Sequence, residues 1–339
     1  MPVPASFNDI TSNQTIRDWR GWVMYQTEFY TPMLQKDQQL WVHFGSVHYR
    51  CYVLVNGFIL GRHVVGHLPF QFRIPEQVYF TNKTNLLVVL VNNELNRETI
   101  PQADIQQPQN NSFAVYPVNY TEVKNHFDFF NYAGIHRPVH LCVFPSTYIE
   151  DIQWMTMVEG KYEKTLMTKI SPKKRSTWED VAQFTINYDI KVAHATALKN
   201  NYTCVLLILD KEGKVYKSYP HCNLKRLQLE ARVWQPKIFT KKLPYLYTIK
   251  VQLLATEHNN LIDEYSFQTG FRSIKCTEDS LVINGLEVYL TGFGRHEDSA
   301  IHGRGFDAAL NVKDTNLIEW IGANSYVRYW IKLISNFDF

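Results

Sequence analysis

Cysteine, glycine and proline are all scarce in this sequence, and each scarcity excludes a class of protein. Of the 339 residues, 5 are Cys, 15 are Gly and 14 are Pro. So little Gly and Pro excludes a collagen-like or low-complexity chain. The cysteines lie far apart without a C-x-x-C pair, so the sequence indicates neither a zinc site nor a disulfide framework. They are Cys51, Cys142, Cys204, Cys222 and Cys276.

An excess of charge and long apolar runs are also missing. The 35 basic and 32 acidic side chains leave a formal net charge of +3, whereas nucleic-acid-binding domains carry a concentrated basic face. The dense basic run at 173–175 (KKR) is interpreted as a solvated loop. No stretch approaches the roughly 18 apolar residues that a membrane span requires. We therefore expect no nucleic-acid partner and no membrane partner.

A secretory signal peptide is not evident, because the first residues (MPVPASFND) turn polar at once. Five N-x-[ST] sequons nevertheless occur, and they carry meaning only in a chain that enters the secretory pathway. The sequons begin at Asn13, Asn82, Asn110, Asn119 and Asn201, which are the candidate glycosylation sites. These two signals conflict, and a missing N-terminus would reconcile them.

Aromatic residues are abundant, at 14% of the chain, with 8 Trp, 20 Tyr and 20 Phe. Such residues favour β-sheets, and their rings also suit the C–H faces of sugars. In the first part of the chain, Asn56-Gly57 predicts a tight hairpin because both residues tolerate positive φ. The strands predicted here, at 40–44, 49–55, 85–91 and 136–144, are typical of a sandwich or jelly roll.

The alternation of apolar and polar residues becomes cleaner after a break near residue 145. In 181–192 every second side chain from Ala182 onward is apolar, which predicts a strand with one buried face. Further strands are predicted at 203–209 and 246–254. About seven short strands are typical of an immunoglobulin-like sandwich, and without a Cys–Trp–Cys spacing it is predicted to be the disulfide-free kind.

From about Cys276 the pattern becomes strand, helix, strand. Strands are predicted at 281–285 and 287–293, and apolar residues then follow helical spacing from Phe306 to Ile321. Gly322 stands where a helix C-terminal cap belongs, and a further extended piece begins at Asn324. This order is the opening of an α/β barrel, but such a barrel takes about 250 residues. The residues from Cys276 onward are therefore enough only for the start of such a barrel.

Three long sequence words carry a family resemblance. The stretch 127–137 (FDFFNYAGIHR) resembles the signature of β-glucuronidases in glycoside hydrolase family 2. The stretches 291–298 (TGFGRHED) and 303–307 (GRGFD) resemble the segment that opens that family's barrel, and 321–326 (IGANSY) is similar to its second barrel strand. Weaker similarities run collinearly with these words, at 4–9, 91–96 and 244–247.

The resemblance implies a mainly β fold in three parts. Residues 1–144 would form an incomplete jelly-roll sugar-binding domain without its first strands, and 145–275 an immunoglobulin-like β-sandwich. Residues 276–326 would form only the start of a TIM (β/α) barrel. After Tyr326 the chain departs from the family's continuation, R-T-S-H-Y-P, so 327–339 is interpreted as an unrelated tail. The chain is thus expected to be truncated at both ends.

The family function implied is hydrolysis of β-D-glucuronides, including glycosaminoglycan ends, by a retaining glycosidase. The resemblance implies a homotetramer without metal or organic cofactor, lysosomal or secreted where a signal peptide is present. A retaining mechanism needs two carboxylates about 5 Å apart, and in the family both are barrel glutamates, one in an Asn-Glu-Pro context. Here the only Asn-Glu pair, Asn93-Glu94, precedes Leu95. We therefore expect no catalytic residue in this chain and predict that it is inactive alone.

One substrate contact is carried over from the family, at Asp128, whose counterpart hydrogen-bonds the sugar. A carboxylate among aromatic rings is costly to bury without donors, and sugar hydroxyls are donors. The alternative is a turn carboxylate that accepts backbone N–H groups. The adjacent Glu297 and Asp298, at the end of a predicted barrel strand, are interpreted as structural.

Three histidines close to these words, His126, His136 and His296, are also interpreted as structural. Two other functions stay open for this chain. It could be a non-catalytic carbohydrate-binding module made of the two β domains, or an assembly module that joins full-length subunits through the sandwich.

Overall fold

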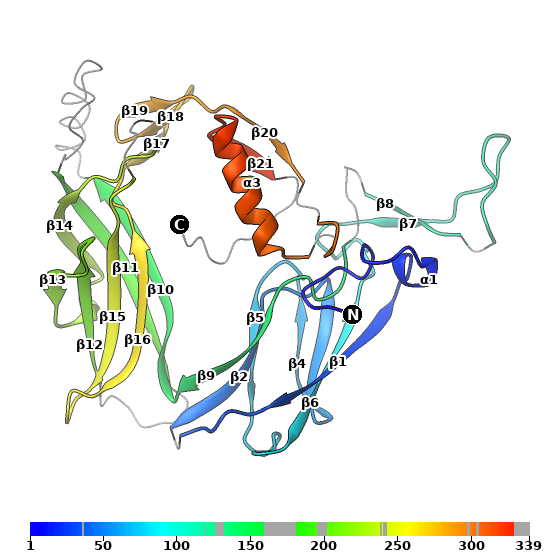
Figure 1. The fold of residues 1–339 in the computed structure, drawn as a ribbon, viewed down its shortest axis with the longest axis horizontal. Helices are drawn as coiled ribbons and strands as arrows, with labels where there is room; N and C mark the ends of the chain where they lie inside the picture. The colour runs from blue at the N-terminus through cyan, green and yellow to red at the C-terminus, as the bar shows by residue number, and fades with distance from the viewer. Residues whose placement is uncertain are drawn as a thin grey trace. The chain divides into compact units, whose positions relative to one another are not determined.

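The computed structural model describes residues 1–35, 37–118, 120–125, 132–158, 181–194, 202–237, 239, 243–296, 299–302 and 305–328. The chain divides into two compact units (Figure 1). One comprises residues 1–143 with a C-terminal segment that begins at Gly292, and the other comprises residues 144–291. None of the described helices is long and apolar enough to cross a membrane.

Two β-sheets form the body of the first unit, in the orders β1-β6-β3-β4 and β5-β2-β9. The strands are β1 (Trp22–Tyr30), β2 (Gln38–Phe44), β3 (Arg50–Val55), β4 (Phe58–Val64), β5 (Phe70–Ile74), β6 (Thr84–Asn92) and β9 (Val139–Pro145). Their inward side chains share one core, in which Leu40, Phe44 and Ile74 are fully buried. The period-2 burial along β2, β3 and β6 explains why these aromatic and β-branched segments form strands.

The predicted hairpin at Asn56-Gly57 is confirmed. Asn56 has φ 49° and Gly57 has φ 84°, and Val55 of β3 faces Phe58 of β4 across the turn. The strand predicted at 136–144 is correct in kind but begins later, at Val139. The residues before it, named here the turn at 132–137 after the positive φ of Gly134, hydrogen-bond to other segments of the chain instead.

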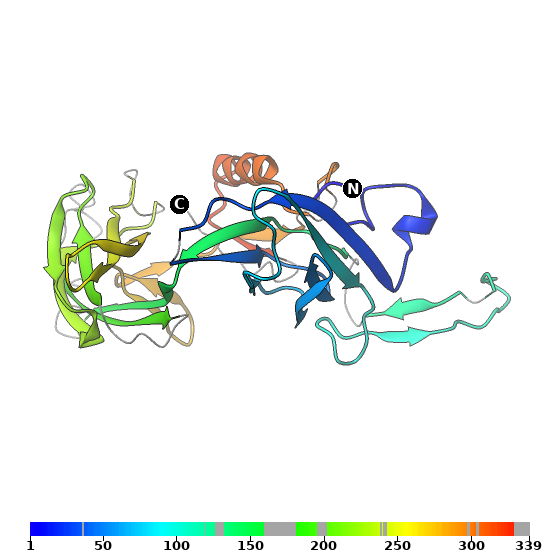
Figure 2. The ribbon, with the colours of Figure 1, turned by 90° about the horizontal axis from the view of Figure 1, so that it is seen from below.

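Three short elements complete the N-terminal part of this unit. They are the helix α1 (Gln14–Arg17) and the strands β7 (Asp104–Gln106) and β8 (Glu122–Lys124). The β7–β8 hairpin extends away from the two sheets of its own unit, as both views show (Figures 1 and 2). Its connecting loop therefore has little of the unit's core to pack on.

The second unit is a sandwich of two antiparallel sheets, in the orders β10-β11-β14 and β13-β12-β15-β16. The strands are β10 (Thr147–Val158), β11 (Val181–His194), β12 (Tyr202–Leu209), β13 (Val215–Tyr219), β14 (Arg226–Arg232), β15 (Tyr247–Ala255) and β16 (Leu261–Thr269). A small sheet of β17 (Ile274–Cys276), β18 (Leu281–Ile283) and β19 (Leu286–Val288) follows.

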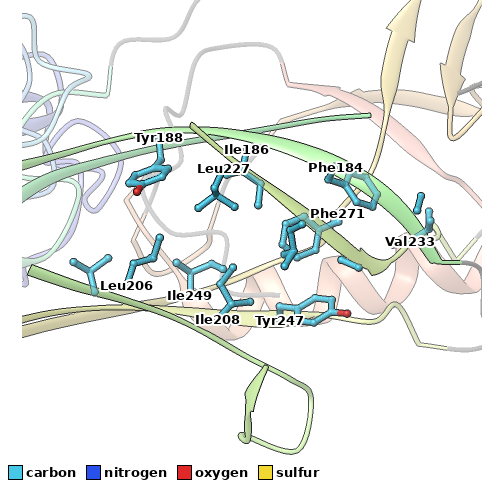
Figure 3. Packing of buried hydrophobic residues seen from close by; sticks show 14 residues of the cluster. Phe184, Ile186, Tyr188, Leu206, Ile208, Leu227, Val233, Tyr247, Ile249 and Phe271 are labelled. Atoms are coloured by element: carbon cyan, nitrogen blue, oxygen red, sulfur yellow. The ribbon is translucent and has the colours of Figure 1, made fainter. Parts of the chain in front are cut away.

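The core of this sandwich follows the alternation that the sequence predicted. Ala182, Phe184, Ile186 and Tyr188 of β11 are buried. In Figure 3 the side chains of β11 and β14 point toward those of β12 and β15. Phe271 packs against Phe184, with ring centroids 5.4 Å apart. Burial of a Phe, Leu or Ile side chain contributes about 1.5–3 kcal/mol, so this cluster is a main source of the unit's stability.

The prediction of a sandwich without a disulfide is wrong. Cys204 in β12 and Cys222, the first residue of the 3₁₀ helix η1 (Cys222–Leu224), form a disulfide with their Cα atoms 5.4 Å apart. The cause is the β12–β13 hairpin, in which Leu206 faces Tyr219 and the chain therefore returns alongside Cys204. Sequence spacing does not reveal such a return. The other three cysteines are free.

The C-terminal segment contains β20 (Gly292–Arg295), α3 (Ala308–Trp320) and β21 (Ser325–Arg328). The two strands are parallel, with Phe293 opposite Tyr326, so the three elements form a βαβ unit. The strand predicted at 287–293 is wrong as a single strand, because β19 pairs with β18 whereas β20 pairs with β21. The strand β21 also runs two residues past the predicted boundary at Tyr326.

The predicted helix end is confirmed, since Gly322 follows α3 with φ 74°. None of the helix residues is buried, and Trp320 is 81% exposed. The helix therefore carries apolar side chains that the described chain does not cover.

Candidate functional site

The predicted sugar contact, Asp128, lies outside the described residues, as do Glu297, Asp298 and His126. The described part of its sequence word begins at Tyr132, four residues further along the chain. The contacts of residues 132–137 are therefore those of the part of this sequence word that the structure describes.

The N-terminal segment holds this turn from one side. The Ala5 amide donates to the Ile135 carbonyl at 3.1 Å, and the Phe7 amide to the Ala133 carbonyl at 3.2 Å. The Ala133 amide in turn donates to Asn8 Oδ1 at 2.9 Å. The described residues of the word 127–137 thus lie beside the word 4–9.

Glycine is required at the centre of the turn. Gly134 has φ 111°, a conformation that side chains rarely adopt. A Cβ atom there would also overlap the Tyr25 hydroxyl oxygen and lie 3.1 Å from Phe7 Cδ1. The tight packing fixes the path of the chain at Gly134.

The segment that opens the predicted barrel reaches the same turn. The Phe306 amide donates to the His136 carbonyl at 2.8 Å, and the Ser6 amide donates to the His302 carbonyl at 3.3 Å. At Gly305 a Cβ atom would lie 2.7 Å from Ala5 Cα, so the two chains approach closely. This loop follows the carboxyl end of β20. Active sites of α/β barrels lie at the carboxyl ends of the strands, so the turn lies at the edge where such a site would form.

The helix that follows this loop is capped and held to β20. Asp307 accepts from the Leu310 amide at 3.0 Å and from the Ser299 hydroxyl at 2.9 Å. These hydrogen bonds, the Leu310 amide first, lower the pKa of the Asp307 carboxyl. Arg295 of β20 pairs with Asp314 of α3 at 2.6 Å, and its side chain is only 8% exposed. The Arg295 guanidinium thus holds α3 to β20.

A cluster of buried histidines supports the turn from the sheet side. His48 is fully buried, and its Nδ1 lies 3.1 Å from the Tyr132 carbonyl. His48 Nε2 lies 3.0 Å from His67 Nδ1, and His67 Nε2 lies 2.7 Å from the Ile100 carbonyl. The His136 ring also packs on His48, with centroids 4.1 Å apart.

Burial opposes a positive charge on the rings of His48 and His67. Burial, with the neighbouring His136 and His67, holds the pKa of His48 well below its ordinary value. Burial also lowers the pKa of His67, with a smaller effect of the Arg137 charge. The interpretation of His136 as structural agrees with its burial. Sequence reasoning missed His48 and His67, because each stands alone in the chain without a motif.

The only Asn-Glu pair in the sequence, Asn93-Glu94, makes structural contacts. Glu94 lies between two arginines, with Arg50 Nη2 at 3.4 Å and Arg20 Nη2 at 3.8 Å. It also accepts from Asn92 Nδ2 at 3.0 Å. Asn93 donates to the Trp19 carbonyl at 2.8 Å. These contacts place the pair in the packing of β6 against the N-terminal segment.

The sequons differ in their surroundings. Asn13 caps α1 by accepting from the Thr15 amide at 2.9 Å. Asn82 lies in an exposed turn with φ 57°, and Asn110 accepts from the Tyr116 amide at 2.7 Å. Asn119 and Asn201 lie outside the described residues. The three described sequons are at the surface, where a glycan can be accommodated.

No group of three or more His, Cys, Asp or Glu side chains is placed to hold a metal ion within the part of the chain that the structure describes. The imidazole nitrogens of the histidine cluster point instead at carbonyls and at each other. The site is thus the turn at 132–137, which hydrogen-bonds to the N-terminal segment and to the loop before α3.

Comparison with known proteins shows which family models and relatives the chain matches. The model "Glycosyl hydrolases family 2" matches residues 168–272, and "Glycosyl hydrolases family 2, TIM barrel domain" matches residues 274–329. The β-glucuronidase of Mus musculus is 35% identical over 331 residues, covering 96% of this chain and 46% of the mouse protein. That of Paenibacillus borealis is 35% identical over 327 residues, 96% of this chain and 49% of the relative.

Solved structures give the same result. A β-glucuronidase from an uncultured Clostridium species matches with a TM-score of 0.75 and 36% identity, covering 96% of this chain and 48% of that chain. A Ruminococcus gnavus β-glucuronidase in complex with D-glucuronic acid matches with a TM-score of 0.76 and 28% identity, covering 96% and 50%.

The chain thus spans about half the length of the relatives it matches. The mainly β fold with the start of a TIM barrel agrees with these matches. On both the sequence words and the fold, this chain matches the models of glycosyl hydrolase family 2 over residues 168–272 and 274–329 and is similar to the β-glucuronidases.

Proposed function

We propose that these 339 residues form the sugar-contacting part of a glycosidase that hydrolyses β-D-glucuronides. Asp128 accepts hydrogen bonds from the hydroxyls of the glucuronide, and the turn at 132–137 holds the loop that carries it. The observation that supports this most is the hydrogen bond from the Phe306 amide to the His136 carbonyl. It brings His136, which follows Asp128 in the same sequence word, to the loop after the carboxyl end of β20, where a barrel enzyme binds its substrate.

The chain by itself binds β-D-glucuronides but does not hydrolyse them. A retaining glycosidase needs a nucleophile and an acid/base about 5 Å apart. The single Asn-Glu pair in the sequence contains Glu94, which two arginines and Asn92 engage. The residues 327–339 contain no glutamate at all. The whole enzyme is then a homotetramer whose catalytic glutamates come from barrel sequence beyond these 339 residues.

A carbohydrate-binding or assembly module is the second candidate. The exposed apolar residues of α3, Leu317 and Trp320 among them, favour it because they offer a surface to further protein.

The Cys204–Cys222 disulfide and the surface sequons fit a secreted or lysosomal protein, since disulfides persist in oxidising compartments.

The binding test uses calorimetric titration of D-glucuronic acid into the purified chain and into Asp128→Asn. A hydrogen bond to a charged group is worth roughly 1.5–3 kcal/mol, so we expect the variant to bind about 10- to 100-fold more weakly. The control is Asp279→Asn, an exposed aspartate of the other unit, which should leave the affinity unchanged. Equal affinity of Asp128→Asn and the unaltered chain would remove Asp128 from the site.

A further inference from the structure

His48 reaches the turn at 132–137 through its side chain and its backbone. Its amide donates to the Gly134 carbonyl at 3.0 Å, and the Gly134 amide donates back to the His48 carbonyl at 3.4 Å. Its ring Nδ1 lies 3.1 Å from the Tyr132 carbonyl. Because a carbonyl oxygen can only accept, Nδ1 carries the proton and donates it. His48 thus hydrogen-bonds to the turn at two positions, Tyr132 and Gly134.

The ring of His48 is itself fixed on its other sides. His67 Nδ1 stands 3.0 Å from Nε2, and the rings of Tyr49 and Tyr132 pack at 4.5 and 4.4 Å between centroids. The ring is therefore locked in the orientation that aims Nδ1 at the turn. The same turn accepts from the barrel-opening loop through the His136 carbonyl.

We propose that His48 is the positioning residue of the turn at 132–137, and that its Nδ1–H donor sets where the preceding loop with Asp128 meets the substrate. This second clause rests on the proposed function. His48 touches no substrate in this proposal, and it acts through the Tyr132 carbonyl. Its role is thus distinct from that of the sugar contact itself.

The test compares four substitutions by hydrogen–deuterium exchange of the amides in 132–137. His48→Asn places an amide N–H where Nδ1 stands, so it keeps the donor to Tyr132. His48→Gln places its N–H further out, toward His67, and His48→Leu has no donor. The control is His43→Leu, which removes a partly buried histidine of β2 in the same unit.

The expected pattern is specific to the Nδ1 donor. Removing the Nδ1 donor from the Tyr132 carbonyl should raise exchange in the turn roughly tenfold or more. We expect this in His48→Leu and His48→Gln, and near-normal protection in His48→Asn and His43→Leu. Protection of the Tyr49 amide, which donates to the Asn92 carbonyl, reports that the sheet has folded. Should His48→Leu not fold, the comparison of Asn with Gln decides alone.

Two outcomes would overturn the inference. One is equal exchange in the turn for the Asn and Gln variants, and the other is unchanged exchange for His48→Leu. Glucuronic acid affinity is measured on the same proteins, and we expect His48→Asn to retain it while His48→Gln loses severalfold. An unaltered chain that binds no glucuronic acid contradicts the proposed function, and the exchange pattern still decides the role of His48.

Discussion

Removal of the disulfide should destabilise the sandwich unit by an amount that its loop length sets. Cys204 and Cys222 are 18 residues apart. In the chain-entropy model a closed loop of that size restricts the unfolded state by roughly 11 cal/mol/K, or about 3 kcal/mol at room temperature. The double variant Cys204→Ala/Cys222→Ala should lose this stabilisation. Because both side chains also pack against the core, reduction of the unaltered chain separates the loss of the bond from the loss of packing.

The assay is urea unfolding followed by pulsed hydrogen exchange in β12 and β15, which reports on the sandwich separately from the other unit. With a slope of about 2–3 kcal/mol per molar urea, a loss of about 3 kcal/mol lowers the midpoint by roughly 1 M or more. Cys276→Ser, which removes an exposed free thiol, should leave the midpoint in place. An unchanged midpoint in the double variant, or free alkylation of both thiols in the native unreduced protein, would refute the disulfide.

Three further substitutions test packing and helix capping within the units. Phe184→Ala, in the centre of the sandwich core, should cost about 3–5 kcal/mol in urea unfolding, whereas Leu261→Ala at a position 55% exposed should cost little. Gly134→Ala should destabilise the first unit more than Gly21→Ala in a thermal melt, because both have positive φ but an added methyl group meets nothing within 4 Å at Gly21. Asp307→Ala removes the cap of α3 and should raise exchange in the first turn of that helix by a factor of about five, for a loss of about 1 kcal/mol. Unchanged exchange there would contradict the cap.

Local signals predicted the local structure well. The hairpin at Asn56-Gly57 and the helix end at Gly322 follow from residues that tolerate positive φ, and both have it in the structure. The alternation in β11 predicted its buried face because side chains of a strand alternate strictly. Such features depend on a few neighbouring residues, which the sequence displays directly.

Features that depend on distant residues could not be predicted from the residues alone. The disulfide forms because a hairpin register brings Cys222 back to Cys204. The break between β19 and β20 follows from pairing with two different sheets. His48 contacts Tyr132 and Gly134, which lie far from it in the sequence, and a single histidine in a run of strand formers gives no signal of that role.

The candidate site was predicted in part. The words at 4–9, 127–137 and 303–307 were recognised separately from their resemblance to the family, and hydrogen bonds bring their described residues together at one turn. Nothing in their spacing along the chain predicts this meeting. The role of Asp128 remains a prediction, since that residue lies outside the described part of the structure.

The most direct measurement is the rate at which the purified 339-residue chain releases 4-nitrophenol from 4-nitrophenyl β-D-glucuronide. A pair of carboxylates about 5 Å apart is what gives a retaining glycosidase its rate, and we expect no such pair in this chain. We expect glucuronide binding with no release above the uncatalysed background. Turnover at an enzymic rate that persists after repeated purification, and that a β-glucuronidase inhibitor abolishes, would contradict the account.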